Sequence, residues 1–409
     1  MNSKSSSTIP LLAVMAVVFV AYLVIGIALP VLPLHVHRDL GLGTFVVGLV
    51  AGSQFAASLS SRFWSGQYAD KRGGKRALIA GLLIAAASGF VYLLSLRFVK
   101  TPVISVTILL LGRGVLGSAE SFIVSGALVW GLALAGPENT GRVMAWVGTA
   151  MYVAFAVGAP SGTVLFSGFG FIAIAIATMF IPLVSLLLVA RRKPVVLEPK
   201  ERPSFRKIIG SVWFPGLGLA LSSLGFGSIT TFIVLLFAKN GWPQAWLSLT
   251  ALSVSFTLGR IFFGHLPDRL GGARVAFISV LIEAAGQVLI WLAPLSIIAL
   301  LGSTVTGIGY ALVYPGFGVE AVRNVPVENR GLATGTYTAF LDLALGTANP
   351  ALGLVAGMAG LRTVFLVSAI VVTLSAVIAI RLMIQYRPAK QKENTGRVSE
   401  QDNLDWSDK

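Results

Sequence analysis

Four ionisable side chains fall inside long apolar stretches of the sequence: Arg113, Glu120, Glu283 and Asp342. A charge in hydrocarbon is costly, so each of these residues is a candidate for function and needs a partner. Arg113 and Glu120 are spaced i and i+7, which places them on one face of a helix about two turns apart. The two can exchange a proton through water, or they can simply neutralise each other, and both interpretations stay open.

Asp342 stands near the middle of its apolar stretch, beside Tyr337, Thr338 and Asn349. A carboxyl group in such a place can load and release protons. Alternatively, it can make a buried hydrogen bond that only packs two helices together. Asp342→Asn separates the two roles, because only the first predicts a changed pH dependence of the protein's activity.

Other patterns with known chemistry lack the context they need. Residues 112–117 spell Gly-x-Gly-x-x-Gly, but they lie in an apolar stretch with no preceding strand, so no dinucleotide site is expected. His35 and His37 diverge on a helix, and the chain holds no cysteine. No metal, no cofactor and no enzymatic activity are therefore predicted.

The composition indicates the solvent in which these residues work. Charged residues make up 11% of the 409 residues and hydrophobic ones 56%, with 45 glycines. A soluble domain carries about 25% charged residues, so a soluble protein is nearly excluded. The net charge of +15 comes from basic residues that interrupt apolar runs, which argues against nucleic-acid binding.

Crossing a bilayer takes about 20 apolar residues in a helix. Twelve stretches are long enough, and they predict an all-α membrane protein. The expected spans are 10–34, 44–67, 77–96, 103–131, 143–166, 169–190, 212–237, 245–266, 274–293, 296–319, 332–357 and 361–384.

Basic residues predict the orientation of these spans, because cytoplasmic loops are enriched in lysine and arginine. With the N-terminus inside, the cytoplasmic side receives 23 basic residues and the opposite loops five. Both termini are predicted to be cytoplasmic, in a multi-pass protein of a bacterial inner membrane.

An internal repeat divides the chain. Residues 62–76 align without gaps on residues 260–274, 198 positions later, with six identities. A second echo pairs Glu138-Asn-Thr-Gly with Glu328-Asn-Arg-Gly. We expect two homologous six-helix halves, 1–190 and 212–384, joined by a cytoplasmic linker, 191–211, and followed by a disordered tail, 385–409.

The loop Gly66-x-x-Ala69-Asp70-Lys71-x-Gly73-x-Lys75 resembles the signature of the major facilitator superfamily. Within it, the runs at 62–70 and 336–346 are similar to the bacterial YhhS and YfcJ type. The resemblance covers nearly the whole chain. It implies alternating access between the two halves of a monomer that binds a small-molecule substrate, protons and the lipid bilayer.

In that superfamily, charge pairs hold the cytoplasmic side closed. The resemblance therefore suggests a cytoplasmic gate made of Asp70, Arg76, Arg142 and Asp268. The alternative is that these charges only set topology, and Asp70→Asn should abolish transport only if the gate exists. Arg62 and Arg260 lie near the inner ends of their spans, where each can anchor to the interface or join the gate.

Proton coupling is suggested by Arg113-x-x-x-Gly117, which resembles the fourth span of proton-coupled members, so Arg113, Glu120 and Asp342 are the predicted coupling residues. Span eleven lines the cavity in this family, which favours Asp342, whereas span nine stands outside it, which favours a structural role for Glu283. Gly148 and the run 158–162 resemble an antiporter signature in part, although glycines four apart also serve close helix packing.

A substrate site is expected among polar and aromatic residues of the cavity helices, and each of these can instead be packing. The candidates are Tyr22, Gln54, Tyr152, Phe226, Thr230, Tyr310 and Tyr314. Few fixed charges among them favour a neutral, apolar or weakly charged substrate. The leading prediction is proton-coupled export of small organic compounds. The alternatives are proton-coupled uptake of a sugar-like or other small metabolite, and an uncoupled lipid flippase or sensor.

Overall fold

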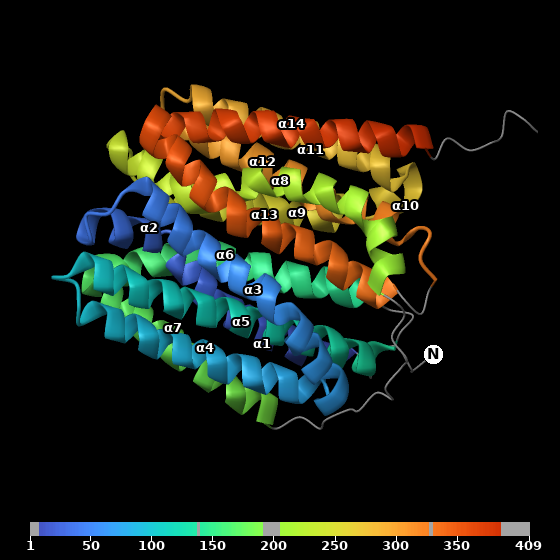
Figure 1. The fold of residues 1–409 in the computed structure, drawn as a ribbon, viewed down its shortest axis with the longest axis horizontal. Helices are drawn as coiled ribbons and strands as arrows, with labels where there is room; N and C mark the ends of the chain where they lie inside the picture. The colour runs from blue at the N-terminus through green and yellow to red at the C-terminus, as the bar shows by residue number, and fades with distance from the viewer. Residues whose placement is uncertain (1–7, 137–139, 191–204, 327–329, 386–409) are drawn as a thin grey trace, which may run out of the picture.

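The computed structural model describes residues 8–136, 140–190, 205–326 and 330–385, which form helices joined by short turns (Figure 1). Residues 191–204 of the predicted linker and 386–409 of the predicted tail lie outside the described residues. The second half begins earlier than expected, because its first helix starts at Phe205 rather than at 212. Hydropathy detects only the apolar part of a helix, and this one continues past it.

The helices fall into two sets. The N-terminal half holds α1 (Thr8–Ala28), α2 (Leu32–Leu34), the π-helical turn η1 (His35–Asp39), α3 (Thr44–Arg72), α4 (Gly74–Leu96), α5 (Pro102–Ala135), α6 (Thr140–Phe169) and α7 (Phe171–Ala190). The C-terminal half holds α8 (Phe205–Lys239), α9 (Trp246–Phe263), α10 (Leu266–Leu270), α11 (Gly272–Leu292), α12 (Ser296–Val322), α13 (Arg330–Ala359) and α14 (Leu361–Gln385).

Among the described residues, eleven helices are long and apolar enough to cross a membrane. The one remaining expected span, 169–190, corresponds to α7, whose apolar part, Phe171–Leu187, is shorter. The first expected span, 10–34, falls in one stretch of membrane-crossing length, Val14–Asp39, although a turn separates α1, which ends at Ala28, from α2, which begins at Leu32. Pro30 and Pro33 explain the break, since a proline lacks the N–H that a helix interior needs.

The two halves lie side by side, with α1–α7 in the lower part of Figure 1 and α8–α14 in the upper part. We call the end of the bundle at Gly73 and Gly271 the linker end, since α7 ends and α8 begins there, and the opposite end the far end. Both glycines have positive φ, 88° and 92°, which only glycine adopts at little cost. They are 198 positions apart, so the repeat makes the same turn in both halves.

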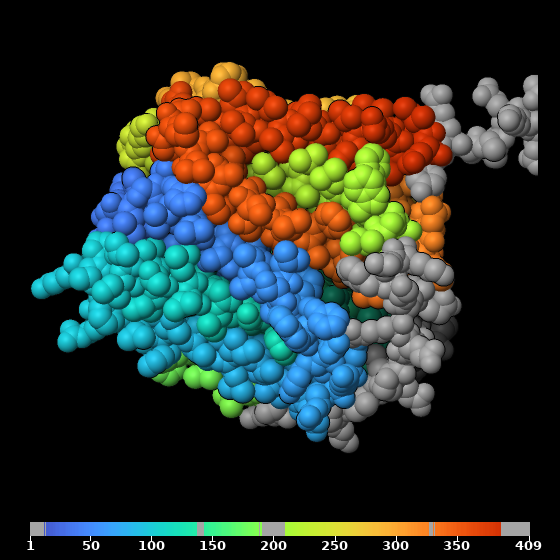
Figure 2. Space-filling model, in the orientation of Figure 1, coloured from blue at the N-terminus to red at the C-terminus, as the bar shows by residue number. Residues whose placement is uncertain are grey.

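Small residues let the halves approach closely. Helices α3 and α13 run antiparallel, and Figure 2 shows them in contact on the surface. At their far ends the Thr44 hydroxyl donates to the Gly353 carbonyl at 2.8 Å. A Cβ at Gly52 would lie 2.8 Å from the Gly346 carbonyl oxygen, so glycine is required for this packing.

The second contact between the halves is made by α6 and α9. The Thr250 hydroxyl donates to the Ala156 carbonyl at 3.1 Å. One and a half turns closer to the linker end, the Tyr152 and Phe256 rings stack with centroids 3.5 Å apart. At the depth of these rings, polar groups form most of the α3–α13 interface, whereas aromatic rings form most of the α6–α9 interface.

Candidate functional site

An ion pair joins the two halves of the protein. Arg62 of α3 donates through Nε to Asp342 of α13 at 2.9 Å, and its second guanidinium nitrogen contacts the same carboxylate oxygen. Ser58, one turn before Arg62, donates to that oxygen at 3.3 Å. The Arg62 and Asp342 side chains are 20% and 3% exposed, so the acid of this pair is buried and the arginine is largely buried.

A second carboxylate lies beside this pair. Glu120 of α5 accepts hydrogen bonds from the Tyr22 hydroxyl at 3.0 Å and from the Gln54 amide at 2.7 Å. Glu120 is within electrostatic reach of both Arg62 and Asp342. The structure therefore brings two acids and one guanidinium together where three helices of one half meet α13 of the other.

A cavity of about 100 Å³ lies between the halves, and of the two acids Glu120 lines it whereas Asp342 does not. Five of the seven predicted substrate residues line it, Gln54, Tyr152, Phe226, Thr230 and Tyr310, together with Arg113 and Glu120. Tyr22 reaches the site by its bond to Glu120, whereas Tyr314 is not among the lining residues. The volume is well below the 300 Å³ or more of a pocket for a drug-sized ligand.

Aromatic rings form part of the cavity wall. Phe226 stacks on Tyr310 with centroids 5.5 Å apart, and Tyr152 meets Phe226 edge-on at 5.9 Å. Phe256, which stacks on Tyr152, also contacts Tyr310 at 5.9 Å. Such a cluster can enclose an apolar or aromatic group of a ligand.

Arg260 lies on α9, one turn after Phe256, and is not among the residues that line the cavity. Its guanidinium carbon is 5.8 Å from the centroid of the Tyr314 ring, a cation–π geometry. Arg260 makes no ion pair with any carboxylate in the part of the chain that the structure describes. It thus differs from Arg62, which has a full charge partner.

Arg113 and Glu120 do not pair with each other. Arg113 is 4% exposed and its Nε has no hydrogen-bond partner among the described residues. The Arg113 guanidinium faces Tyr92 of α4, while the Glu120 carboxylate accepts hydrogen bonds from Tyr22 and Gln54. Arg113 and Glu120 share the cavity wall without an ion pair between them.

Glu283 of α11 lies inside the C-terminal half rather than between the halves. It is fully buried, and Ser222 of α8 donates to one of its carboxylate oxygens. The other oxygen has no hydrogen-bond partner among the described residues. This position is compatible with the structural role expected for Glu283.

The predicted gate residues lie at the linker end. Asp70 is exposed on the last turn of α3, Arg76 on the first turn of α4, and Asp268 on α10. Neither Arg76 nor Asp268 forms an ion pair with a described residue. The side chain of Arg142 lies outside what the structure describes, so the gate stays a prediction.

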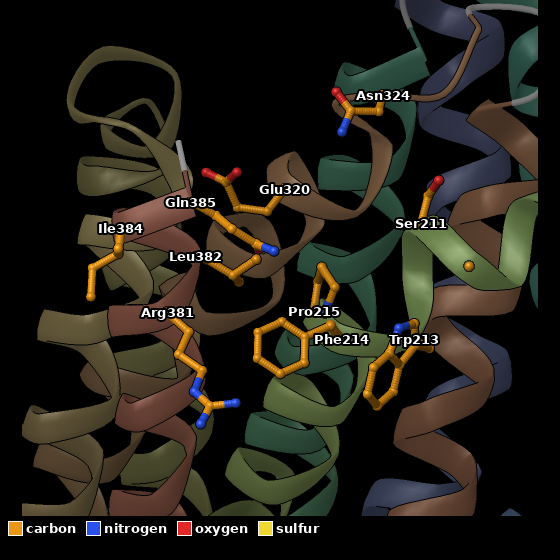
Figure 3. Close-up of a pocket in the computed structure, with 11 residues that line it drawn as sticks. Ser211, Trp213, Phe214, Pro215, Glu320, Asn324, Arg381, Leu382, Ile384 and Gln385 are labelled. Atoms are coloured by element: carbon orange, nitrogen blue, oxygen red, sulfur yellow. The ribbon is translucent and has the colours of Figure 1, made fainter. Parts of the chain in front are cut away.

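A larger hollow of about 600 Å³ opens at the linker end between α8, α12 and α14 (Figure 3). Trp213 and Phe214 line it on one side and Arg381 and Gln385 on the other. All of its lining residues belong to the C-terminal half. It is therefore separate from the cavity between the halves.

Comparisons with known proteins agree with this architecture. A profile of the Major Facilitator Superfamily matches residues 14–252 and 216–407. An uncharacterized MFS-type transporter of Salmonella typhimurium is 38% identical over 94% of this chain and 99% of its own length. Another, from Burkholderia pseudomallei, is 40% identical over 95% of both chains.

Among solved structures, a bacterial homolog of the human lysosomal transporter Spinster, in an inward-facing and unoccupied conformation, superposes with a TM-score of 0.74. It is 14% identical and covers 95% of this chain and all of its own, which shows the fold. The two curated relatives and the family profile go further: this chain belongs to the major facilitator superfamily and is a multi-pass membrane transporter.

Proposed function

We propose that this transporter is a proton-coupled secondary transporter, in which Asp342, Glu120 and Arg62 link proton binding to the movement of the halves. The observation that carries the proposal is the buried Arg62–Asp342 pair, because it joins α3 of one half to α13 of the other. A proton on Asp342 removes one charge of that pair, so it weakens the contact between the halves.

Glu120 gives the proton a second place to bind. Two carboxylates share one guanidinium at this site, and like charges near each other favour protonation of one of them. Gln54 and Tyr22 hold Glu120 in the cavity wall. A proton entering the cavity therefore meets Glu120 beside the pair that joins the halves, which supports transfer from one acid to the other.

The orientation follows from the basic residues. The linker end carries the loops rich in lysine and arginine, which supports a cytoplasmic linker end in a bacterial inner membrane. Export by antiport, predicted from the glycines of α6, and uptake by symport are the two directions that experiment must separate. In both, the central cavity is the substrate site and the protein works as a monomer.

Purified protein in liposomes loaded with a pH-sensitive dye tests the proposal. A thermal-shift screen supplies a compound that stabilises the protein, and this compound is added under pH gradients of both signs. Proton coupling predicts substrate-dependent proton flux, inward with export for antiport and parallel to the substrate for symport. Substrate movement without proton flux would instead favour an uncoupled flippase or facilitator.

A further inference from the structure

The two interfaces between the halves are related by the internal repeat. Ser58 and Arg62 of α3 correspond to Phe256 and Arg260 of α9, 198 positions later. Helices α6 and α13 correspond at an offset of 190 positions, which pairs their internal prolines, Pro160 and Pro350. At that offset, Asp342 of α13 corresponds to Tyr152 of α6.

The corresponding residues meet in both places, but with different chemistry. At the first interface, Ser58 donates to Asp342 and Arg62 pairs with it. At the second, Phe256 stacks on Tyr152 with centroids 3.5 Å apart. The arginine is kept at both interfaces, and the acid is present at only one.

Arg260 is consequently a partly buried cation that has no carboxylate partner among the described residues. Tyr314 stands under its guanidinium at 5.8 Å, and Tyr152 and Tyr310 also lie within electrostatic reach. A cation–π contact compensates the charge of a largely buried arginine less than an ion pair does. Two other buried acids of the same half have different partners, since Glu283 faces Ser222 and Glu320 pairs with Arg323.

Arg260 does not line the central cavity, but its neighbour on α9 contacts residues that do. Phe256, one turn before Arg260, stacks on Tyr152 and contacts Tyr310, and both of these tyrosines line the cavity. Phe226, stacked on Tyr310, adds an aromatic surface to the same wall. A small ligand in the cavity can place an anionic group toward Arg260 and an aromatic or apolar body against these rings.

We infer that Arg260 and the aromatic wall formed by Tyr152, Phe226 and Tyr310 bind a small organic monoanion, with a carboxylate at Arg260 and an apolar or aromatic body in the cavity. The substrate then supplies at the second interface the carboxylate that Asp342 supplies at the first. Its binding draws α6 and α9 together as the Arg62–Asp342 pair draws α3 and α13. The inference rests on the proposed function, because it takes the central cavity to be the substrate site.

The negative charge of the inferred substrate affects the direction of coupling between substrate and proton. An anion at Arg260 and a proton on Glu120 or Asp342 add opposite charges to one cavity, so each favours the binding of the other. Such mutual attraction favours symport over the antiport predicted from the sequence. The proton-flux experiment described above therefore measures a consequence of this inference as well.

Benzoate and benzamide, added to the full-length protein in detergent, are the probes. They share ring and shape but only benzoate is charged, and binding is measured by titration calorimetry. The wild-type protein should prefer benzoate, and Arg260→Gln should weaken benzoate binding about 10- to 100-fold, as expected for a lost charge-assisted hydrogen bond. Absence of benzoate binding, or an equal response to both compounds, would overturn the inference.

Tyr152→Asp keeps Arg260 and provides a second test. It places an acid at the position that corresponds to Asp342, so the new carboxylate should form an ion pair with Arg260 and abolish benzoate binding. Tyr152→Asn is the matched control, since it loses the ring without adding a charge, and it should retain preference for benzoate over benzamide. Equal binding by the two variants would contradict the inference even if Arg260→Gln fails to fold.

These binding measurements do not depend on proton coupling. If benzoate binds through Arg260 but no substrate drives proton flux, the anion site stands and the proposed coupling fails. If Asp342→Asn loses proton flux while Arg260→Gln leaves benzoate binding unchanged, the coupling stands and the anion site fails.

Discussion

The Arg62–Asp342 pair should control the separation of α3 and α13 at the linker end. In Asp342→Asn, Arg62 loses the partner that it contacts through two nitrogens. Removing one member of a buried pair costs about 3–5 kcal/mol, because a buried charge is left uncompensated. Glu120 lies within reach of Arg62, so we expect the lower end of this range, about 3 kcal/mol.

A loss of about 3 kcal/mol shifts the equilibrium between closed and separated arrangements by roughly 100-fold. The double variant Arg62→Gln/Asp342→Asn should recover part of this loss, because it leaves no uncompensated charge. The recovered part is the coupling free energy of the pair, typically about 0.5–3 kcal/mol for residues in contact.

The chain has no cysteine, so spin labels can be attached at introduced cysteines without a background. Arg72→Cys at the end of α3 and Arg330→Cys at the start of α13 are both exposed and mark the two linker ends. Pulsed electron spin resonance then measures the distance between the labels. Asp342→Asn should add a longer distance that the wild type lacks, and the double variant should add less of it.

Glu283→Gln is the matched control, since it neutralises a buried carboxylate inside one half. It should leave the distance distribution unchanged. The reasoning would be refuted if Asp342→Asn gave the wild-type distribution, or if the double variant separated the helices as much as the single one.

Three further predictions concern other parts of the protein. The Glu120→Gln side chain carries no titratable proton, so the dependence of the transport rate on pH should become weaker. A pH profile equal to that of the wild type would exclude Glu120 from proton coupling. Gly117→Ala should lower the free energy of unfolding by about 1–3 kcal/mol and so lower the melting temperature, because the new Cβ collides with the Gln54 carbonyl. Gly114→Ala on the same helix meets only Ala57 at 3.8 Å and should be tolerated in the same melting experiment. Asp70→Asn should abolish transport but leave membrane insertion normal, as measured by the yield of the variant in the membrane. Full transport activity would show that this charge only sets topology.

The sequence predicted the architecture because hydrophobic length and internal repetition are strong local signals. Apolar stretches of about 20 residues predict spans without knowledge of their neighbours. The helix bounds differ from the expected spans at two places. Helix α8 begins at Phe205, before its apolar part, and a turn with proline interrupts the α-helix between Ala28 and Leu32. A hydropathy profile detects neither the polar start of a helix nor a turn within an apolar run.

The site was predicted in parts. Glu120 was a candidate for proton coupling, and Tyr22 and Gln54 were candidates for substrate binding. Both of the latter donate to Glu120, and these hydrogen bonds depend on three different helices. Helix phase suggested Arg113 as the neighbour of Glu120, although Arg113 faces Tyr92. The phase of one helix places residues on a face but does not say which other helix covers that face.

A signal for the Arg62–Asp342 pair was present in the sequence. Arg62 lies ten residues from the linker end of α3 and Asp342 twelve from that of α13, depths of about 15 and 18 Å. Two opposite charges at similar depth can pair if their helices are neighbours. That neighbourhood is set by the packing of the two halves, which no local pattern of the sequence specifies.

The central claim is that Asp342 couples protons to the movement of the halves. The most direct test compares the wild type with Asp342→Asn in liposomes, using one transported compound under an imposed pH gradient and in exchange without a gradient. If Asp342 couples protons to transport, Asp342→Asn loses accumulation driven by the gradient but still exchanges the compound, since exchange needs no net proton movement. Accumulation by Asp342→Asn equal to that of the wild type would show that Asp342 does not couple protons to transport.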